Sequence, residues 1–171
     1  METNTSTSGK AAGVVMAVPV EQWVTFTLAN EIYAINVMQV QEVLKYIKVA
    51  PVPGAPNYVC GIINLRGKVV TVIDTRKRFG LPAGVITDQC RIVIIETAQQ
   101  VVGIMVDNVL EVVELDAKTI AAAPNVGTNM GGNQETLEFI QGVCEYGGNL
   151  LILIDLNKLL TEAEWEELAR L

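Results

Sequence analysis

The fold is decided by the stretch Gly61–Asp74, which reads GIINLRGKVVTVID. Two runs rich in β-branched residues flank a short polar break, and Gly67 in that break can take the positive φ that a tight turn requires. The stretch therefore predicts a β-hairpin. Its tip carries Arg66, whose planar fork of five N–H donors suits a carboxylate or a group of carbonyl oxygens.

The hairpin stretch has a partial copy further along the chain. Two glycines and an aspartate return at one constant offset of 81 residues, as Gly142, Gly148 and Asp155, and an apolar run again precedes the aspartate. An offset of 69 residues relates the segments that come before each copy. This repetition predicts two related β-modules, the first at about 21–80 and the second at about 90–160. The position of Arg66 is taken by glycine in the second copy, so the cation belongs to the first module alone.

Each module contains patterns for about five short strands, which in a small antiparallel protein close into a barrel and leave no long free edge. We therefore expect a mainly β protein of two packed five-stranded barrels with short helices. Residues 1–20 predict a disordered tail, because they are polar or lack any helical or strand period. Residues 161–171 predict a C-terminal helix that starts with a capping box and docks Trp165 on a barrel.

Composition excludes several classes of function. A net charge of -7 and a pI of about 4.6 argue against a nucleic-acid-binding surface, which needs concentrated Lys and Arg. Histidine is absent, which removes the usual general base near neutral pH and the commonest metal ligand. The three cysteines are unevenly spaced and fit neither a disulfide framework nor a CxxC metal site. We expect no catalytic residues, no metal and no cofactor.

The remaining charged residues have ordinary structural explanations. Asp74 and Asp155 form the best carboxylate pair, but both follow a strand where a helix N-cap is wanted, so capping is favoured over catalysis. The basic run at 76–78 is interpreted as a solvated face, and Asp107 with Asn108 as a turn pair. Charges interrupt every long apolar run and the first residues lack a basic start, so we expect a cytoplasmic protein without direct membrane insertion.

Five segments together resemble CheW, the coupling protein family of bacterial chemotaxis, over a range from about Trp23 to the final helix. The Asn-Leu-Arg-Gly tip after a glycine-led strand is the most specific of them. The segments are VQEV at 40–43, the proline-rich run at 51–56, GIINLRG at 61–67, VVGIMVD at 101–107 and LILIDLNKLL at 151–160. The family fold is a double SH3-like β-barrel, the architecture that the internal repeat had already suggested.

The resemblance implies a non-catalytic adaptor that couples chemoreceptors to a kinase in signalling arrays. The expected partners are the regulatory domain of the histidine kinase CheA and the cytoplasmic tip of methyl-accepting chemoreceptors. It further implies that Arg66 and Glu42 form an ion pair on the receptor-facing surface. The residues expected around this pair are Val37, Val40, Gly61, Asn64 and Leu65.

Other interpretations stay open at this point. Glu42 and Arg66 also fit a plain surface ion pair, and Val40 fits the core as well as it fits an interface. A small-molecule-binding double β-barrel that uses the groove between the lobes is the alternative function. A β-barrel enzyme with a carboxylate site at Asp74 or Asp155 is a weaker rival.

Overall fold

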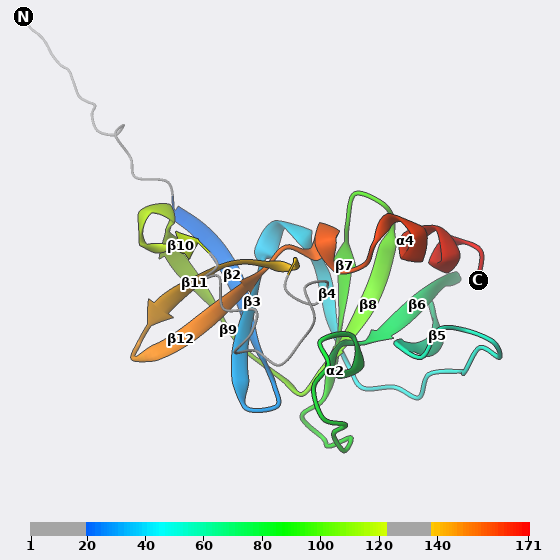
Figure 1. Ribbon diagram of the computed structural model, residues 1–171. Helices are drawn as coiled ribbons and strands as arrows, with labels where there is room; N and C mark the ends of the chain where they lie inside the picture. The colour runs from blue at the N-terminus through cyan, green and yellow to red at the C-terminus, as the bar shows by residue number, and fades with distance from the viewer. Residues whose placement is uncertain (1–19, 123–137) are drawn as a thin grey trace, which may run out of the picture.

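The computed structural model describes residues 20–122 and 138–171, which form two β-sheets that lie side by side (Figure 1). The predicted tail at 1–20 falls almost entirely outside these residues. The six-stranded lobe has the order β10-β11-β12-β3-β2-β9, and the five-stranded lobe has the order β4-β7-β8-β6-β5. Because β10 has only two residues, each lobe has five principal strands. This confirms the predicted mainly β fold of two packed small barrels.

The bounds of the elements follow the chain. The strands are β2 (Val20–Leu28), β3 (Glu31–Asn36), β4 (Val40–Lys45), β5 (Val59–Leu65), β6 (Lys68–Asp74), β7 (Arg91–Glu96), β8 (Val101–Val106), β9 (Asn108–Asp116), β10 (Ala121–Ala122), β11 (Ile140–Tyr146) and β12 (Asn149–Ile154). The short helices are η1 (Val37–Gln39), α2 (Thr75–Arg78), η2 (Ala117–Thr119), η3 (Leu156–Lys158) and α4 (Glu162–Ala169).

Each lobe takes strands from both sequence modules. The first hairpin, β2 with β3, pairs with β9 and β12, while β7 and β8 of the second module pair with β4 and β6. The expectation that each module closes its own barrel is therefore wrong. The repeat itself is preserved, because the two lobes have the same strand order once each strand is replaced by its counterpart in the other module. The module boundaries drawn from the sequence stay a prediction.

The first glycine of each copy lies where its barrel closes. Gly61, with φ of +151°, lies against the carbonyl of Ala50, and an added Cβ would come within 2.2 Å of that oxygen. Ala50 and Ile62 exchange two backbone hydrogen bonds of 2.9 and 2.8 Å there. At the corresponding position Gly142 lies against Ala121, where a Cβ would come within 2.6 Å of the carbonyl oxygen. The glycines repeat because two backbones must approach closely at both closures.

The core has three parts, because many strands are buried on both faces. In β7, Ile92 and Ile94 fill the interior of the five-stranded lobe, whereas Val93 and Ile95 face the cluster shared by the two lobes. Trp23 lies inside the six-stranded lobe, while its neighbour Val24 belongs to the shared cluster. Successive side chains of such a strand therefore point to opposite faces of the sheet. One face fills a barrel interior, and the other packs at the junction between the lobes.

The C-terminal helix α4 is docked as predicted. The side chain of Thr161 accepts a hydrogen bond from the Glu164 amide, and the Glu164 side chain accepts one from the Thr161 amide, which completes the capping box. Trp165 and Leu168 are buried in the shared cluster. Arg78 of α2 donates to the carbonyl of Leu159 at 2.7 Å and pairs with Glu164, so the helix is fixed to the five-stranded lobe by charge as well as by packing.

Candidate interaction site

The tip of the β5–β6 hairpin is a two-residue turn with Arg66 and Gly67 at its centre. Leu65 and Lys68 pair directly across it. Both central residues have positive φ, 51° at Arg66 and 86° at Gly67, as type I′ hairpin turns require. The Asn64 side chain accepts a 2.9 Å hydrogen bond from the Gly67 amide and so reinforces the turn. The predicted hairpin and the predicted glycine conformation are both confirmed.

Arg66 occupies a backbone conformation that glycine adopts more easily. The corresponding turn between β11 and β12 has Gly147 and Gly148 at its two positive-φ positions. Side chains other than Gly, Asn and Asp adopt this region rarely, because the Cβ crowds the following carbonyl. Residues held in such conformations cluster at functional sites. The strained backbone at Arg66 therefore supports the prediction that this arginine serves a function.

Arg66 and Glu42 form the expected ion pair, which links the hairpin tip to strand β4. The Nη1 group donates to Oε1 at 3.3 Å and the Nη2 group donates to Oε2. This hydrogen bonding lowers the pKa of Glu42 and raises the pKa of Arg66. The Arg66 side chain remains 70% exposed, compared with 27% for Glu42. The pair is thus oriented by the protein but accessible to a partner.

We call the residues around this pair the Arg66 surface, which consists of Val37, Val40, Glu42, Asn64, Leu65 and Arg66. Val37 and Val40 are half-buried and pack against the shared cluster, so each is partly core and partly surface. Leu65 is half-buried against the interior of the five-stranded lobe. A β-bulge before Glu42 interrupts the pairing of β4 with β7, a feature that re-aims side chains at functional sites. Gly61 is buried at the barrel closure, so it acts on this surface only through the backbone.

A hollow of about 240 Å³ adjoins Arg66 on the same lobe. Arg66 and Lys68 supply its positive charge, and Leu65 and Val101 supply aliphatic walls. Val69 also borders the hollow and is 66% exposed. Neither Val69 nor Val101 was predicted as a site residue from the sequence. The sequence signal for Val69 is its place just after the turn at Arg66, whereas Val101 lies on a different hairpin and has no such local signal.

Comparisons with known proteins agree on one family. The model of the CheW-like domain matches residues 22–164. The chain belongs to the CheW-like family. It is 39% identical over 140 residues to the chemotaxis protein CheW of Bacillus subtilis, covering 82% of this chain and 86% of that protein. It is 35% identical over 164 residues to the chemotaxis protein CheW of Treponema pallidum, covering 92% of this chain and 94% of that protein.

A solved CheW structure has the same fold. The scaffolding protein TtCheW from Thermoanaerobacter tengcongensis superposes with a TM-score of 0.73 at 34% identity, over 81% of this chain and 91% of that one. This CheW-like chain is therefore a chemotaxis scaffold of the coupling-protein type and not an enzyme. The resemblance inferred from the Asn-Leu-Arg-Gly tip and its companion segments is confirmed.

The carboxylates considered for catalysis are helix caps in this CheW-like protein. Asp74 accepts a 3.1 Å hydrogen bond from the Lys77 amide, and Asp155 accepts a 3.0 Å hydrogen bond from the Asn157 amide. Each thus starts a short helix directly after a strand, as predicted. Within residues 20–122 and 138–171, no group of three or more Cys, Asp or Glu side chains is arranged to hold a metal ion.

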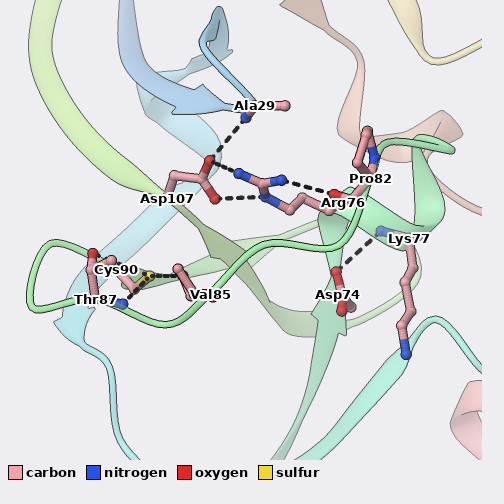
Figure 2. A network of polar contacts seen from close by, with 9 residues as sticks. All are labelled: Ala29, Asp74, Arg76, Lys77, Pro82, Val85, Thr87, Cys90 and Asp107. Atoms are coloured by element: carbon pink, nitrogen blue, oxygen red, sulfur yellow. Dashed lines mark hydrogen bonds and ion pairs between the residues drawn. The ribbon is translucent and has the colours of Figure 1, made fainter.

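Two of the three residues of the basic run at 76–78, Arg76 and Arg78, are half-buried and paired with carboxylates, while Lys77 is exposed. The interpretation of the whole run as a solvated face is therefore wrong. Figure 2 shows Arg76 donating to both oxygens of Asp107, at 3.0 Å from Nε and 2.5 Å from Nη2. Asp107 also accepts a 2.9 Å hydrogen bond from the Ala29 amide, and Arg76 donates to the carbonyl of Pro82 at 2.8 Å. Since Ala29 belongs to the turn between β2 and β3, this network ties the two lobes together. Asp107 is therefore more than a turn residue.

The described part of this CheW-like chain contains no helix that combines the length and the apolar character needed to span a bilayer.

Proposed function

We propose that this protein couples the cytoplasmic tips of chemoreceptors to the histidine kinase CheA, and that the Arg66 surface is its receptor contact. The observation that carries the proposal is the exposed arginine held in a strained turn and oriented by a bidentate carboxylate. A residue other than glycine in this position costs backbone energy, and residues held in such conformations cluster at functional sites. This protein would act from the cytoplasm, in arrays that reach the membrane through protein contacts.

The chemistry of the Arg66 surface suits the tip of a helical hairpin. Such a tip presents apolar side chains at helical spacing together with carboxylates. Val37, Val40 and Leu65 supply half-buried aliphatic contacts. The guanidinium remains largely exposed beside them while Glu42 fixes its plane. A buried apolar centre with a charged group at its rim is the usual anatomy of a specific protein interface.

The proposal is tested by adding two partners separately to isotope-labelled protein and following backbone amide shifts by NMR. The partners are the regulatory domain of the kinase and a receptor signalling tip. We expect the receptor tip to shift the amides of 37–42 and 64–68, and the kinase domain to shift a different face. Absence of shifts with both partners would contradict the adaptor function.

A substitution at Arg66 can test receptor binding without changing the fold. Arg66→Gly places in the turn the residue that the second copy uses, so the hairpin geometry is kept while the guanidinium is lost. We expect an unchanged fold, at least tenfold weaker receptor binding and unchanged binding to the kinase domain. Gly147→Ala is the control for a change at the equivalent turn of the other lobe. Its new Cβ has open space but a positive φ of 59°, so we expect a small loss of stability and unchanged receptor binding. Equal receptor affinity of Arg66→Gly and wild type would refute the assignment of this surface.

The effect on signalling is measured in reconstituted complexes of receptor, kinase and this protein. Arg66→Ala is expected to lower receptor-dependent kinase activation while leaving the far-ultraviolet circular dichroism spectrum unchanged. Full activation by a variant of wild-type stability would count against the coupling role of Arg66.

A further inference from the structure

A cavity of about 300 Å³ lies on the five-stranded lobe between the segment 84–86 and the barrel. Its volume is at the lower end of the range found for small-ligand sites. The strand side of the cavity is largely apolar. That side is lined by Tyr46, Val49, Cys60, Met105 and Val106. Burial raises the pKa of the Cys60 thiol to about 12, so this side chain is neutral at physiological pH.

The polar end of the cavity is formed by three charged side chains, those of Asp74, Arg76 and Asp107. Their arrangement does not favour the binding of an anion. Each of the three guanidinium nitrogens of Arg76 already donates, two of them to Asp107 and the third to the carbonyl of Pro82. Gly84 lies flat against that guanidinium, where a Cβ would come within 2.6 Å of its carbon atom. The negative charge of Asp107 cancels the positive charge of Arg76. The carboxylate of Asp74 therefore gives the residues that line the cavity one net negative charge.

One carboxylate oxygen of Asp74 is available to accept a hydrogen bond from a ligand. Its Oδ1 atom accepts from the Lys77 amide, and among the described residues no hydrogen bond engages its Oδ2 atom. Lys77 is exposed and is not part of the lining, and Figure 2 shows its side chain leading away from the Arg76–Asp107 pair. Its positive charge reaches the cavity only as a minor influence that lowers the pKa of Cys60, against the larger effect of burial. A donor on a cation inside the cavity would therefore meet a partly satisfied carboxylate, with which a charge-assisted hydrogen bond is favourable.

The segment over the cavity is anchored at both ends, and between them the carbonyl of Val85 accepts a long 4.0 Å hydrogen bond from the Cys90 thiol. At its start the carbonyl of Pro82 is held by Arg76, and at its end Thr87 and Cys90 close a tight turn through backbone and thiol hydrogen bonds (Figure 2). Between these anchors Val85 and Ile86 are 83% and 57% exposed although both line the cavity. Two aliphatic side chains at the mouth of an apolar cavity gain by closing over an apolar occupant.

We propose that this cavity binds a small organic monocation with an apolar body, with its ammonium on Asp74 and its body under Val85 and Ile86. A volume of 300 Å³ holds about ten non-hydrogen atoms, if each takes the share of volume of a water molecule in the liquid. The site lies apart from the Arg66 surface, so the proposal stands or falls independently of the coupling function.

The test uses three probes with the same aromatic body and different heads: phenethylammonium, 2-phenylethanol and 3-phenylpropionate. Each is titrated into the full-length labelled protein, while the amides of 84–86 and the Met105 methyl group are followed by NMR. We expect saturable shifts with the cation, with a dissociation constant of roughly 1 mM for a ligand of this size, weaker binding of the alcohol and none of the carboxylate.

A matched pair of variants tests the role of Asp74. Asp74→Asn keeps an efficient helix cap and removes the charge, so it is expected to weaken binding of phenethylammonium about tenfold and leave the alcohol unchanged. Asp155→Asn makes the same change at the equivalent cap of the other lobe and is expected to have no effect. The proposal is overturned if no probe gives saturable shifts, if the carboxylate binds as well as the cation, or if the two variants behave alike.

Discussion

Replacing Gly61 by alanine tests the assignment of this glycine to barrel closure. The new Cβ would come within 2.2 Å of the Ala50 carbonyl oxygen and 2.7 Å of its carbonyl carbon, and neither backbone atom can move without disturbing the closure. The φ of +151° is itself a conformation that costs a non-glycine residue about 1–3 kcal/mol. Overpacking at a tight contact adds about 1–3 kcal/mol.

The substitution Gly61→Ala would also weaken the backbone hydrogen bonds that close the barrel. The two hydrogen bonds between Ala50 and Ile62 are each worth about 1 kcal/mol and lie next to the substituted residue. We therefore expect Gly61→Ala to lower the free energy of unfolding by at least about 3 kcal/mol. This is a large share of the roughly 5–15 kcal/mol that holds a natural domain together. Any loss of partner binding in this variant should follow the unfolded fraction.

Urea unfolding followed by the fluorescence of the buried Trp23 and Trp165 measures the loss. Gly67→Ala is the control, because it also replaces a positive-φ glycine but has no neighbouring atom within 4 Å of the new Cβ. We expect this control to cost only about 1–2 kcal/mol, the cost of a left-handed backbone for a residue with a Cβ. If Gly61→Ala were no more destabilising than Gly67→Ala, the close-approach explanation for the repeated glycine would be refuted.

Two further predictions concern the packing of α4 and the ion pair between the lobes. Trp165→Ala removes a buried side chain from the shared cluster and should cost about 3–5 kcal/mol in chemical unfolding; a loss below 1 kcal/mol would mean that α4 is not docked in solution. Partial burial acts to raise the pKa of Asp107, but hydrogen bonds from Arg76 and the Ala29 amide outweigh it and the pKa lies below its ordinary value. The stabilisation from this group is therefore complete above about pH 5 and is lost as the pH falls through the folded-state pKa, below about 4. The difference in unfolding free energy between wild type and Asp107→Asn should shrink over that interval, and a constant difference would contradict the assignment.

Local features could be predicted from the sequence because their causes lie close together along the chain. The hairpins follow from period-two patterns and turn residues, and the caps at Asp74 and Asp155 follow from a preference that acts over two or three residues. The tip at Arg66 was found through its turn chemistry and its motif. Its pairing with Glu42 came from the family resemblance, since 24 residues separate the two partners.

Features that depend on distant partners were missed. An alternating strand looks the same whichever sheet it joins, so nothing in β2 and β3 indicated that they would pair with the second module. The basic run at 76–78 looked solvated because its partners lie far away in sequence. Asp107 is 31 residues from Arg76, and Glu164 is 86 residues from Arg78.

The pairing of the first hairpin with the second module has a practical consequence for dissecting this protein. All strands of the five-stranded lobe lie within the continuous segment 40–106, whereas those of the other lobe come from two pieces on either side of it. No single truncation can isolate the six-stranded lobe. A fragment covering 40–106 would carry most of the Arg66 surface, but it would expose Val93, Ile95 and Ile104 to water and invite aggregation. Partner contacts of this scaffold are therefore better mapped with point substitutions in the intact chain than with deletion fragments.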